Sequence, residues 1–282
     1  MTGIENTNIE NTNIENTLRE KIYSHIWREE AEKDDPFTAQ TCYLAGYDVY
    51  GDLLGKIQWT DYIYVLFKQD PPSKDISKCL NDLAVAIAAN GPRDLSTQAA
   101  TSAAAGGSTL ASCLIAALSV GAGKLGGARE VHDAILVWET CSTNLKEWKH
   151  FLTQTWPVTS HSIWPDSEHP FGFDPHGMNC STPIKQTLAH LAEISDPNSK
   201  LRWLNNNRKA LEEYAGMPLS MSGVASCAFS DMGFDSQEGE MLYLLLRLPG
   251  AAAFSLEQHY RGWEDYPFHK NGLKLTHDPG PE

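Results

Sequence analysis

Positive charge is scarce in this 282-residue sequence. Lysine and arginine together number 22 against 36 aspartate and glutamate residues, which leaves a formal net charge of -14. An acidic surface repels phosphate backbones, so a nucleic-acid partner would need a local basic stripe, and the longest basic cluster is only Lys146, Lys149 and His150. We therefore expect no nucleic-acid partner, although a few cations inside one cleft are enough for a small anionic molecule.

Paired cysteines and a secretory leader are also lacking. The six cysteines lie far apart, and none belongs to a Cys-x-x-Cys pair. The first residues are polar and acidic, whereas a signal peptide needs a basic start followed by an apolar run. We expect reduced, mostly buried thiols in a cytoplasmic protein.

Long apolar runs are scarce as well. Residues 95–123 form the longest uncharged stretch, but Ala, Ser, Thr and Gly dominate it, and only residues 110–120 are strongly apolar. Because small residues let helices approach closely, this composition favours a helix in the core or at a subunit interface over a membrane span. We predict no membrane partner and place this helix at the centre of the protein.

The chain does contain a tandem repeat near its start. The pentapeptide Ile-Glu-Asn-Thr-Asn occupies residues 4–8 and 9–13 and begins again at residues 14–17. A five-residue period matches neither helix nor strand, and the segment has too little apolar surface to offset its ordering entropy. We predict a disordered tail over residues 1–17.

Apolar residues recur at helical spacing through much of the remaining chain. Such patterns cover residues 59–67, 80–87 and 184–194. Alternating strand-like runs are nearly absent, and Pro and Gly cluster between the helical segments. The expected fold class is all-α, with amphipathic helices packed around an apolar one.

Generic catalytic and cofactor motifs are missing. The sequence lacks the glycine-rich dinucleotide and phosphate loops, His-Glu-x-x-His and Gly-x-Ser-x-Gly. A polar cluster from His161 to His176 includes Asp166, Glu168 and His169 and has ligands suited to a divalent metal. Its prolines and glycine are more typical of an ordered, solvated loop. We therefore predict no metal site and no tightly bound cofactor.

Five segments carry a family resemblance. They are Ala89–Pro92, Leu118–Ala128, His169–Pro175, Leu219–Met232 and Arg247–Gln258. In this order they resemble the citrate synthase superfamily, above all its shorter members, the citryl-CoA lyases and the citrate-synthase-like part of ATP citrate lyase. Upstream, Gly46-Tyr47-Asp48 with Trp59–Phe67 resembles the family's early helices, so the similarity covers residues 40–268.

The resemblance implies an α-helical homodimer with a citrate synthase-like fold. Each chain would have a large helical domain and a smaller, mobile one that closes over an acyl-CoA. We expect residues 18–129 and 245–282 to form the large domain and residues 130–244 the small one. The expected partners are a small-molecule acyl-CoA, an oxo-acid, or both, with the coenzyme A thioester as substrate.

The family's chemistry makes or breaks a carbon–carbon bond next to a thioester carbonyl. That reaction needs a base for the α proton and donors for the enolate oxygen and the oxo-acid carbonyl. By resemblance, His169 occupies the position of the donor to the oxo-acid carbonyl or citryl hydroxyl. Asn90 stands where lyase-type relatives have His, and it donates hydrogen bonds without exchanging protons near neutral pH. Ser222 replaces the catalytic Asp and is no base on its own, so the catalytic motif is partly substituted.

Three further residues are candidate substrate contacts. Arg247 belongs to the family's Arg-x-x-Gly motif, and its fork geometry suits a carboxylate. Arg261 lies where relatives have a basic C-terminal segment that reaches substrate or CoA phosphates. His176 stands where the family usually has the Arg of Asp-Pro-Arg, so anion binding there would be weaker and dependent on pH.

Asp174 and Asp231 are the nearest carboxylates in sequence to replace the missing base. For Asp231, helix capping or surface exposure is the simpler expectation. Losing a positioned general base typically costs about 10²- to 10⁴-fold in rate, so ordinary citrate formation or citryl-CoA cleavage should be slow or absent.

Three functions remain open. The first is an enzyme with an altered substrate, in which a retro-Claisen or decarboxylative step generates the enolate without removal of an α proton. The second is a pseudoenzyme that binds acyl-CoA or a partner. The third is a hydrolase of a CoA thioester or carbon–carbon bond, in which His169 activates Ser222 or water.

Overall fold

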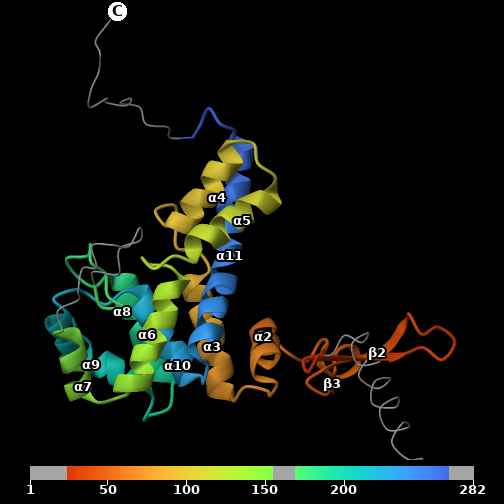
Figure 1. Ribbon diagram of the computed structural model, residues 1–282, viewed down its shortest axis with the longest axis horizontal. Coiled ribbons are helices and arrows are strands. Elements are labelled where there is room, and N and C mark those ends of the chain that lie inside the picture. The colour runs from red at the N-terminus through yellow and green to blue at the C-terminus, as the bar shows by residue number, and fades with distance from the viewer. Residues whose placement is uncertain (1–23, 155–168, 267–282) are drawn as a thin grey trace, which may run out of the picture. The chain divides into compact units, whose positions relative to one another are not determined.

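The computed structural model describes residues 24–154 and 169–266 (Figure 1). The chain divides into two compact units, Met1–Pro72 and Ser73–Glu282. The tandem repeat predicted to form a disordered tail lies outside the described residues. The domain limits expected near residues 130 and 244 stay predictions.

The described part of the first unit contains a small antiparallel sheet. Strands β1 (Trp27–Ala31), β2 (Ala39–Leu44) and β3 (Tyr47–Asp48) pair in that order. A short π-helix, η1 (Val49–Leu53), and helix α2 (Trp59–Lys68) follow. The helical pattern over residues 59–67 is confirmed by α2.

The sheet corrects the expectation that this region is helical. Tyr47 and Asp48, expected to begin the early helices, form β3 instead. Ala45 and Gly46 join β2 to β3 with φ of 48° and 88°, the positive values that two-residue hairpin turns require. Most residues of the strands are exposed, so the sequence shows little of the apolar alternation that marks a half-buried sheet.

The second unit is helical in its described part, as the all-α prediction requires. Its helices are α3 (Lys74–Ile87), α4 (Leu95–Ala105), α5 (Leu110–Gly121), α6 (Ala128–Cys141), α7 (Leu145–Leu152), α8 (Thr182–Ile194), α9 (Lys200–Ala215), α10 (Met221–Asp231) and α11 (Ser236–Arg261). Ser, Thr, Asp or Asn side chains cap most of their N-termini, and Asp235 and Glu238 form a capping box at the start of α11.

The central helix of this unit is α10, and the placement of α5 at the centre was wrong. Every residue of α10 from Ser222 to Phe229 is buried, and the helix contacts α3, α6, α8, α9 and α11. In contrast, α5 packs through Cys113 and Ala117 onto α4 and one part of α11, while Ile115 on its other face is 61% exposed. Figure 1 shows α4 and α5 beside the C-terminal part of α11, apart from α6 to α10.

A proline inside α11 ties this helix to the segment that carries Asn90. Pro249 lies inside the continuous helix and has no N–H to donate. The following N–H, that of Gly250, donates to Ala88 O at 2.8 Å, just beyond the end of α3. A Cβ on Gly250 would lie 2.3 Å from that oxygen, so only glycine permits the contact. Residues 88 and 89 are thereby held against α11.

The sequence predicts no membrane-spanning helix. Within residues 24–154 and 169–266, none is both long and apolar enough to cross a bilayer.

Candidate active site

A cavity of about 530 Å³ lies in the second unit, between the start of α4, the end of α5, α6, the loop after residue 168, α10 and α11. Five of the six predicted site residues line it: Asn90, His169, His176, Ser222 and Arg247. The structure therefore brings together residues from four separate sequence motifs. Convergent polar groups in a cavity of this size are typical of a small-molecule site.

The sixth predicted residue, Arg261, does not line this cavity. It is the last residue of α11, and it forms an ion pair with Glu257, one turn earlier on the same helix. Its side chain is 59% exposed. The structure thus separates Arg261 from the other five residues within one chain, and its contact with a substrate stays a prediction.

Ser222 lies in the first turn of α10, where two chain segments approach closely. Ser220 caps the helix by accepting a hydrogen bond from Gly223 N at 3.2 Å, and Ser220 N donates to Gly172 O at 3.0 Å. A Cβ on Gly223 would lie 2.3 Å from Gly172 O, so glycine allows the loop to contact the helix. This contact places Ser222, only 3% exposed, at the cavity wall near His169.

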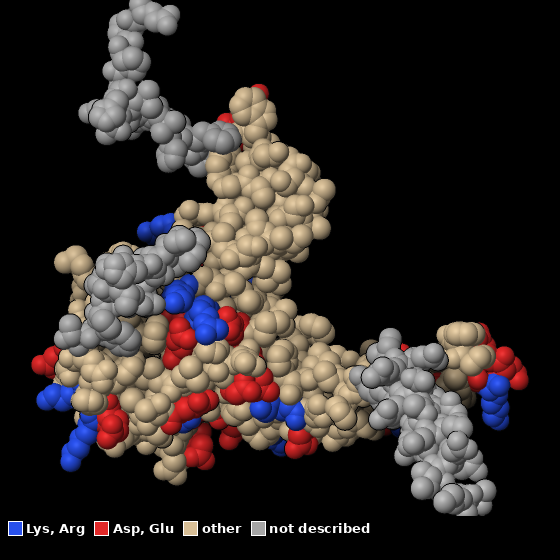
Figure 2. All heavy atoms as spheres, in the orientation of Figure 1, with Lys and Arg blue, Asp and Glu red and all other residues tan. Residues whose placement is uncertain are grey.

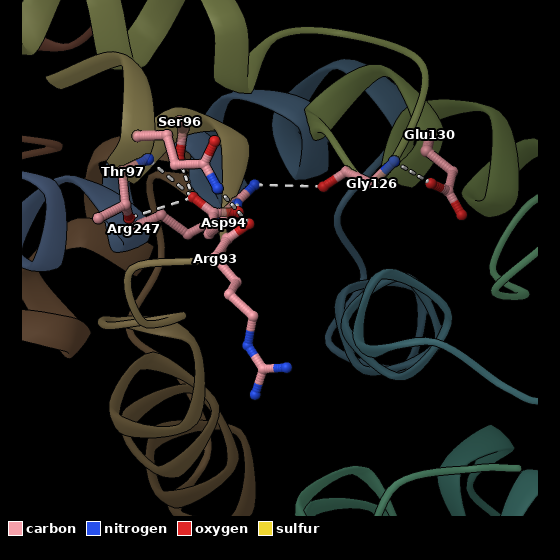
Figure 3. A network of polar contacts seen from close by, with 8 residues as sticks. Arg93, Asp94, Ser96, Thr97, Gly126, Glu130 and Arg247 are labelled. Carbon is pink, nitrogen blue, oxygen red and sulfur yellow. Dashed lines mark hydrogen bonds and ion pairs between the residues drawn. The ribbon is translucent and has the colours of Figure 1, made fainter. Parts of the chain in front are cut away.

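Glu130 is a buried residue of the cavity that the sequence motifs missed. It is 2% exposed and accepts hydrogen bonds at Oε1 from Ser222 Oγ at 2.9 Å and Gly172 N at 3.0 Å. Its Oε2 accepts from Gly126 N at 2.7 Å, a contact visible in Figure 3. His169 Nε2 lies 3.9 Å from Oε1. One buried carboxylate therefore holds the serine, faces the histidine and joins two loops of the cavity.

The helical period of α6 contained the signal for this residue. Glu130 shares a helix face with Ala134, Val137 and Cys141, all of which are buried. A carboxylate on an apolar face is rarely buried without partners. Glu130 falls two residues after the segment Leu118–Ala128, which is why that motif alone did not identify it.

Arg247 is held by groups of the protein itself (Figure 3). Its guanidinium forms an ion pair with Asp94, donates to Gly126 O at 3.4 Å and lies 4.8 Å from the centre of the Tyr243 ring. In the carboxamide orientation that satisfies both groups, Asn90 Oδ1 accepts from Nη2 at 3.0 Å and from Nε at 2.7 Å. Arg247 was predicted to bind substrate, but most N–H donors of its guanidinium therefore already bond to groups of the protein.

The same contacts fix the chemistry of Asn90. Because its oxygen faces Arg247, its Nδ2 is the end that remains to donate a hydrogen bond to a ligand. Tyr243, below the guanidinium, is 2% exposed, and burial raises the pKa of its phenol. The tyrosine is therefore neutral near pH 7 and adds no charge to this wall of the cavity.

Three charged or titratable residues complete the cavity lining. Arg93 is exposed, and its guanidinium extends away from the network around Arg247 in Figure 3. His176 is exposed, and its backbone N–H donates to Asp174 Oδ1 at 2.9 Å. Asp174, one of the two proposed replacement carboxylates, also lines the cavity.

The other replacement carboxylate, Asp231, has a structural role, as expected. Its oxygens accept hydrogen bonds from Lys200 N at 2.7 Å and Leu201 N at 2.8 Å at the start of α9. Burial raises the pKa of this carboxyl despite those donors. Asp231 does not line the cavity that contains Ser222.

The polar loop considered for a metal is only partly described. His161, Asp166 and Glu168 lie outside the described residues. Across the part of the chain that the structure covers, no cluster of three or more His, Cys, Asp or Glu side chains is arranged to hold a metal ion.

No protein-family model matches the sequence, and no curated protein sequence does. Solved structures do match. Citryl-CoA lyase from Hydrogenobacter thermophilus has a TM-score of 0.69 and 19% sequence identity, over 93% of this chain and 96% of that chain. ATP citrate lyase from Methanothrix soehngenii, in complex with citrate and coenzyme A, has a TM-score of 0.63 and 15% identity, over 95% of this chain and 44% of that chain. Citrate synthase from Thermotoga maritima MSB8 has a TM-score of 0.56 and 18% identity, over 80% of this chain and 58% of that chain.

These matches establish the fold. The chain has a citrate synthase-like helical fold, as the sequence motifs predicted. The citryl-CoA lyase is matched along nearly its whole length, whereas the chain spans 44% of the ATP citrate lyase chain. At 15% to 19% identity the likeness extends to the fold alone, so the chemistry depends on the residues of the cavity.

Proposed function

We propose that this protein binds an acyl-CoA thioester and makes or breaks a carbon–carbon bond next to the thioester carbonyl. The observation that carries the proposal is the convergence of Asn90, His169 and Ser222 on one cavity of about 530 Å³. The named neighbours support it, because one is a citryl-CoA lyase and another was solved with citrate and coenzyme A. The coenzyme A thioester is the substrate in this proposal.

The cavity residues suit cleavage of a citryl-type thioester. The substrate hydroxyl would give its proton to His169 while the adjacent carbon–carbon bond breaks. The positive charge gained by the imidazole would face the Glu130 carboxylate, 3.9 Å away. The electrons of the broken bond form the enolate of the departing thioester, and Asn90 Nδ2 would donate to its oxygen. Cleavage itself generates the enolate, so no base has to remove an α proton. The enolate carbon would then take up the proton that His169 accepted, or one from water, to give the free thioester.

A decarboxylative reaction would use the same three groups. A malonyl-type thioester loses carbon dioxide to form the enolate, which Asn90 would hold through its oxygen. The enolate carbon then attacks the carbonyl of an oxo-acid, and His169 would donate a proton to the oxygen that becomes the hydroxyl. Both reactions accommodate serine in place of the catalytic aspartate, because Ser222 has only to donate or accept hydrogen bonds.

The hydrolase alternative is less well supported. A serine nucleophile needs its proton directed to the histidine that acts as base. Ser222 Oγ donates instead to Glu130 Oε1 at 2.9 Å, and its other partner is Ser220 Oγ at 2.6 Å. This arrangement favours Ser222 as a hydrogen-bonding group.

Replacing His169 with glutamine should lower turnover by about 10²- to 10⁴-fold, because a positioned acid–base group is lost. Product formation is to be followed from citryl-CoA, and from malonyl-CoA with oxaloacetate. Binding of each thioester is to be followed by the shift in melting temperature, which should persist in the variant. His190→Gln is the matched control, since His190 is half exposed and contacts Asp82 at 2.8 Å outside the cavity.

The outcomes separate the alternatives. Thioester-dependent stabilisation of the wild-type protein without any carbon–carbon product would replace the enzyme proposal with the pseudoenzyme. Free thiol released without a carbon–carbon product would favour the hydrolase. Neither stabilisation nor product from any thioester would contradict the acyl-CoA proposal as a whole.

A second copy of the chain is the partner that we propose for the exposed face of α5. Ala111, Ile115 and Ser119 share this face, and residues 95–123 contain no charged side chain. An apolar, uncharged helix face built from small residues suits close packing against an identical surface. The citrate synthase-like resemblance implies the same homodimer.

Ile115→Lys should convert the dimer to a monomer at micromolar concentration, because two lysines would be buried at a symmetric interface. The measurement is light scattering coupled to size-exclusion chromatography. Val85→Lys is the control, since Val85 is a comparable apolar residue on α3 that is 74% exposed. A wild-type protein that is monomeric under these conditions would exclude the proposed interface.

A further inference from the structure

The cavity contains few cations that could meet an anionic ligand. Among the described residues, Arg93 and Arg247 are the arginines that line it, and no lysine does. Arg247 is 8% exposed and is bonded to Asp94, Asn90 and Gly126. Releasing it for a ligand would leave the Asp94 carboxylate, whose side chain is only 15% exposed, without its charge partner. Arg247 therefore stabilises the protein and is not available to bind a ligand.

Within the part of the chain that the structure describes, Arg93 has no comparable ion pair. The nearest acid in sequence, Asp94, is occupied by Arg247 and accepts further hydrogen bonds from Ser96 Oγ and from Thr97 N at 3.0 Å. Figure 3 shows the Arg93 side chain extended in the opposite direction, with no interaction drawn to its guanidinium. The Arg93 guanidinium, at the rim of the cavity, is thus available to bind a ligand.

The backbone on both sides of Arg93 is fixed. Asp94 N donates to Gly91 O at 3.2 Å across a turn in which Gly91 has a φ of 79° and Pro92 sets the second position. The Gln98 side chain donates to Arg93 O at 3.2 Å. These contacts hold the Arg93 backbone in place three residues from Asn90. The guanidinium can therefore reach only a limited volume beside the cavity.

We propose that Arg93 binds a carboxylate of the substrate, in the role that the family resemblance suggested for Arg247. The planar guanidinium matches a carboxylate with two parallel hydrogen bonds. Arg247 then acts as a positioning residue that orients Asn90. The assignment of this carboxylate to an oxo-acid or citryl group rests on the proposed function, but carboxylate binding itself can be measured without turnover.

The test compares the dissociation constants of wild-type and variant protein by calorimetry. Citrate, oxaloacetate and malonate carry carboxylates without phosphate, whereas free coenzyme A carries phosphates without a carboxylate. Arg93→Gln should weaken carboxylate binding by about 10- to 100-fold and leave coenzyme A binding unchanged. Arg93→Lys should restore part of the loss, because it returns the charge without the fork. Arg28→Gln, on β1 in the other unit, is the control for removal of one positive charge.

Each outcome decides the assignment. Weaker carboxylate binding in Arg93→Gln supports it, even if no thioester is turned over, in which case only the proposed function fails. Equal binding by Arg93→Gln and wild type would overturn it, as would a wild-type protein that binds none of the three carboxylates. A loss confined to coenzyme A would show that Arg93 binds phosphate and would overturn the carboxylate assignment.

Discussion

Glu130→Ala is expected to lower the free energy of unfolding by roughly 2 to 4 kcal/mol and to abolish any activity of the cavity. The variant leaves Gly126 N, Gly172 N and the Ser222 hydroxyl without the acceptor they share. Gly172 N and the Ser222 hydroxyl are buried, and each buried donor that loses its partner costs about 1 to 3 kcal/mol, offset in part because the costly burial of a carboxylate is relieved. Urea unfolding measures the loss.

The matched control is Glu139→Ala, because Glu139 lies on the same helix, α6, and is exposed. Its free energy of unfolding should change by about 0.5 kcal/mol or less. Glu130→Gln keeps the volume but has only one oxygen for donors on both sides, so it should fall between wild type and Glu130→Ala. A Glu130→Ala protein as stable as wild type would contradict the role of Glu130 in joining the loops.

Loss of activity should exceed what the loss of stability explains. At temperatures where Glu130→Ala remains folded, the serine and the Gly172 loop are no longer held at fixed positions beside His169. Small misplacements of positioned groups can cost about 100-fold in rate. A folded variant with undiminished turnover would show that the carboxylate serves stability alone.

The helices and the convergence of the cavity residues were largely predictable, for different reasons. Helical periodicity depends on local spacing, and α2, α3 and α8 appear where it indicated. Asn90, His169 and Ser222 share no periodicity, and they were placed together only because their motifs resemble those of a family whose fold brings such segments together. Glu130 lay on the buried face of α6, but two of its three partners, Gly172 and Ser222, are 42 and 92 residues away, so no local pattern could identify them.

The errors have physical causes as well. The strands of the first unit are short and mostly exposed, and therefore lack the alternation that sequence patterns detect. The uncharged α5 was placed at the centre because apolar composition does not distinguish a face covered by the same chain from one left exposed. The engagement of Arg247 by Asp94 joins residues 153 positions apart, and a motif cannot report whether a guanidinium is already paired.

The connection between α11 and the Asn90 segment gives a second large expected effect. Gly250→Ala should lower the free energy of unfolding by roughly 2 to 4 kcal/mol. The new Cβ would lie 2.3 Å from Ala88 O and 2.7 Å from Ala89 Cα, and both are backbone atoms that cannot rotate away. Overpacking costs about 1 to 3 kcal/mol, and loss of the hydrogen bond from Gly250 N to Ala88 O adds about 1 kcal/mol.

Gly250→Ala should displace Ala88 and Ala89 and so disturb the cavity, because Asn90 directly follows them. Asn90 also bonds to Arg247, which lies one turn before Gly250 on α11. Separation of the two segments would break the contact that orients the Asn90 carboxamide, and turnover of a thioester should fall by about 100-fold in the folded variant. Gly106→Ala is the control, since its added Cβ meets only ordinary contacts at 3.5 Å and 3.6 Å at the end of α4. Its stability should stay within about 1 kcal/mol of wild type. If Gly250→Ala unfolded at the same urea concentration as Gly106→Ala, the α11 contact would not be what holds Asn90 in place.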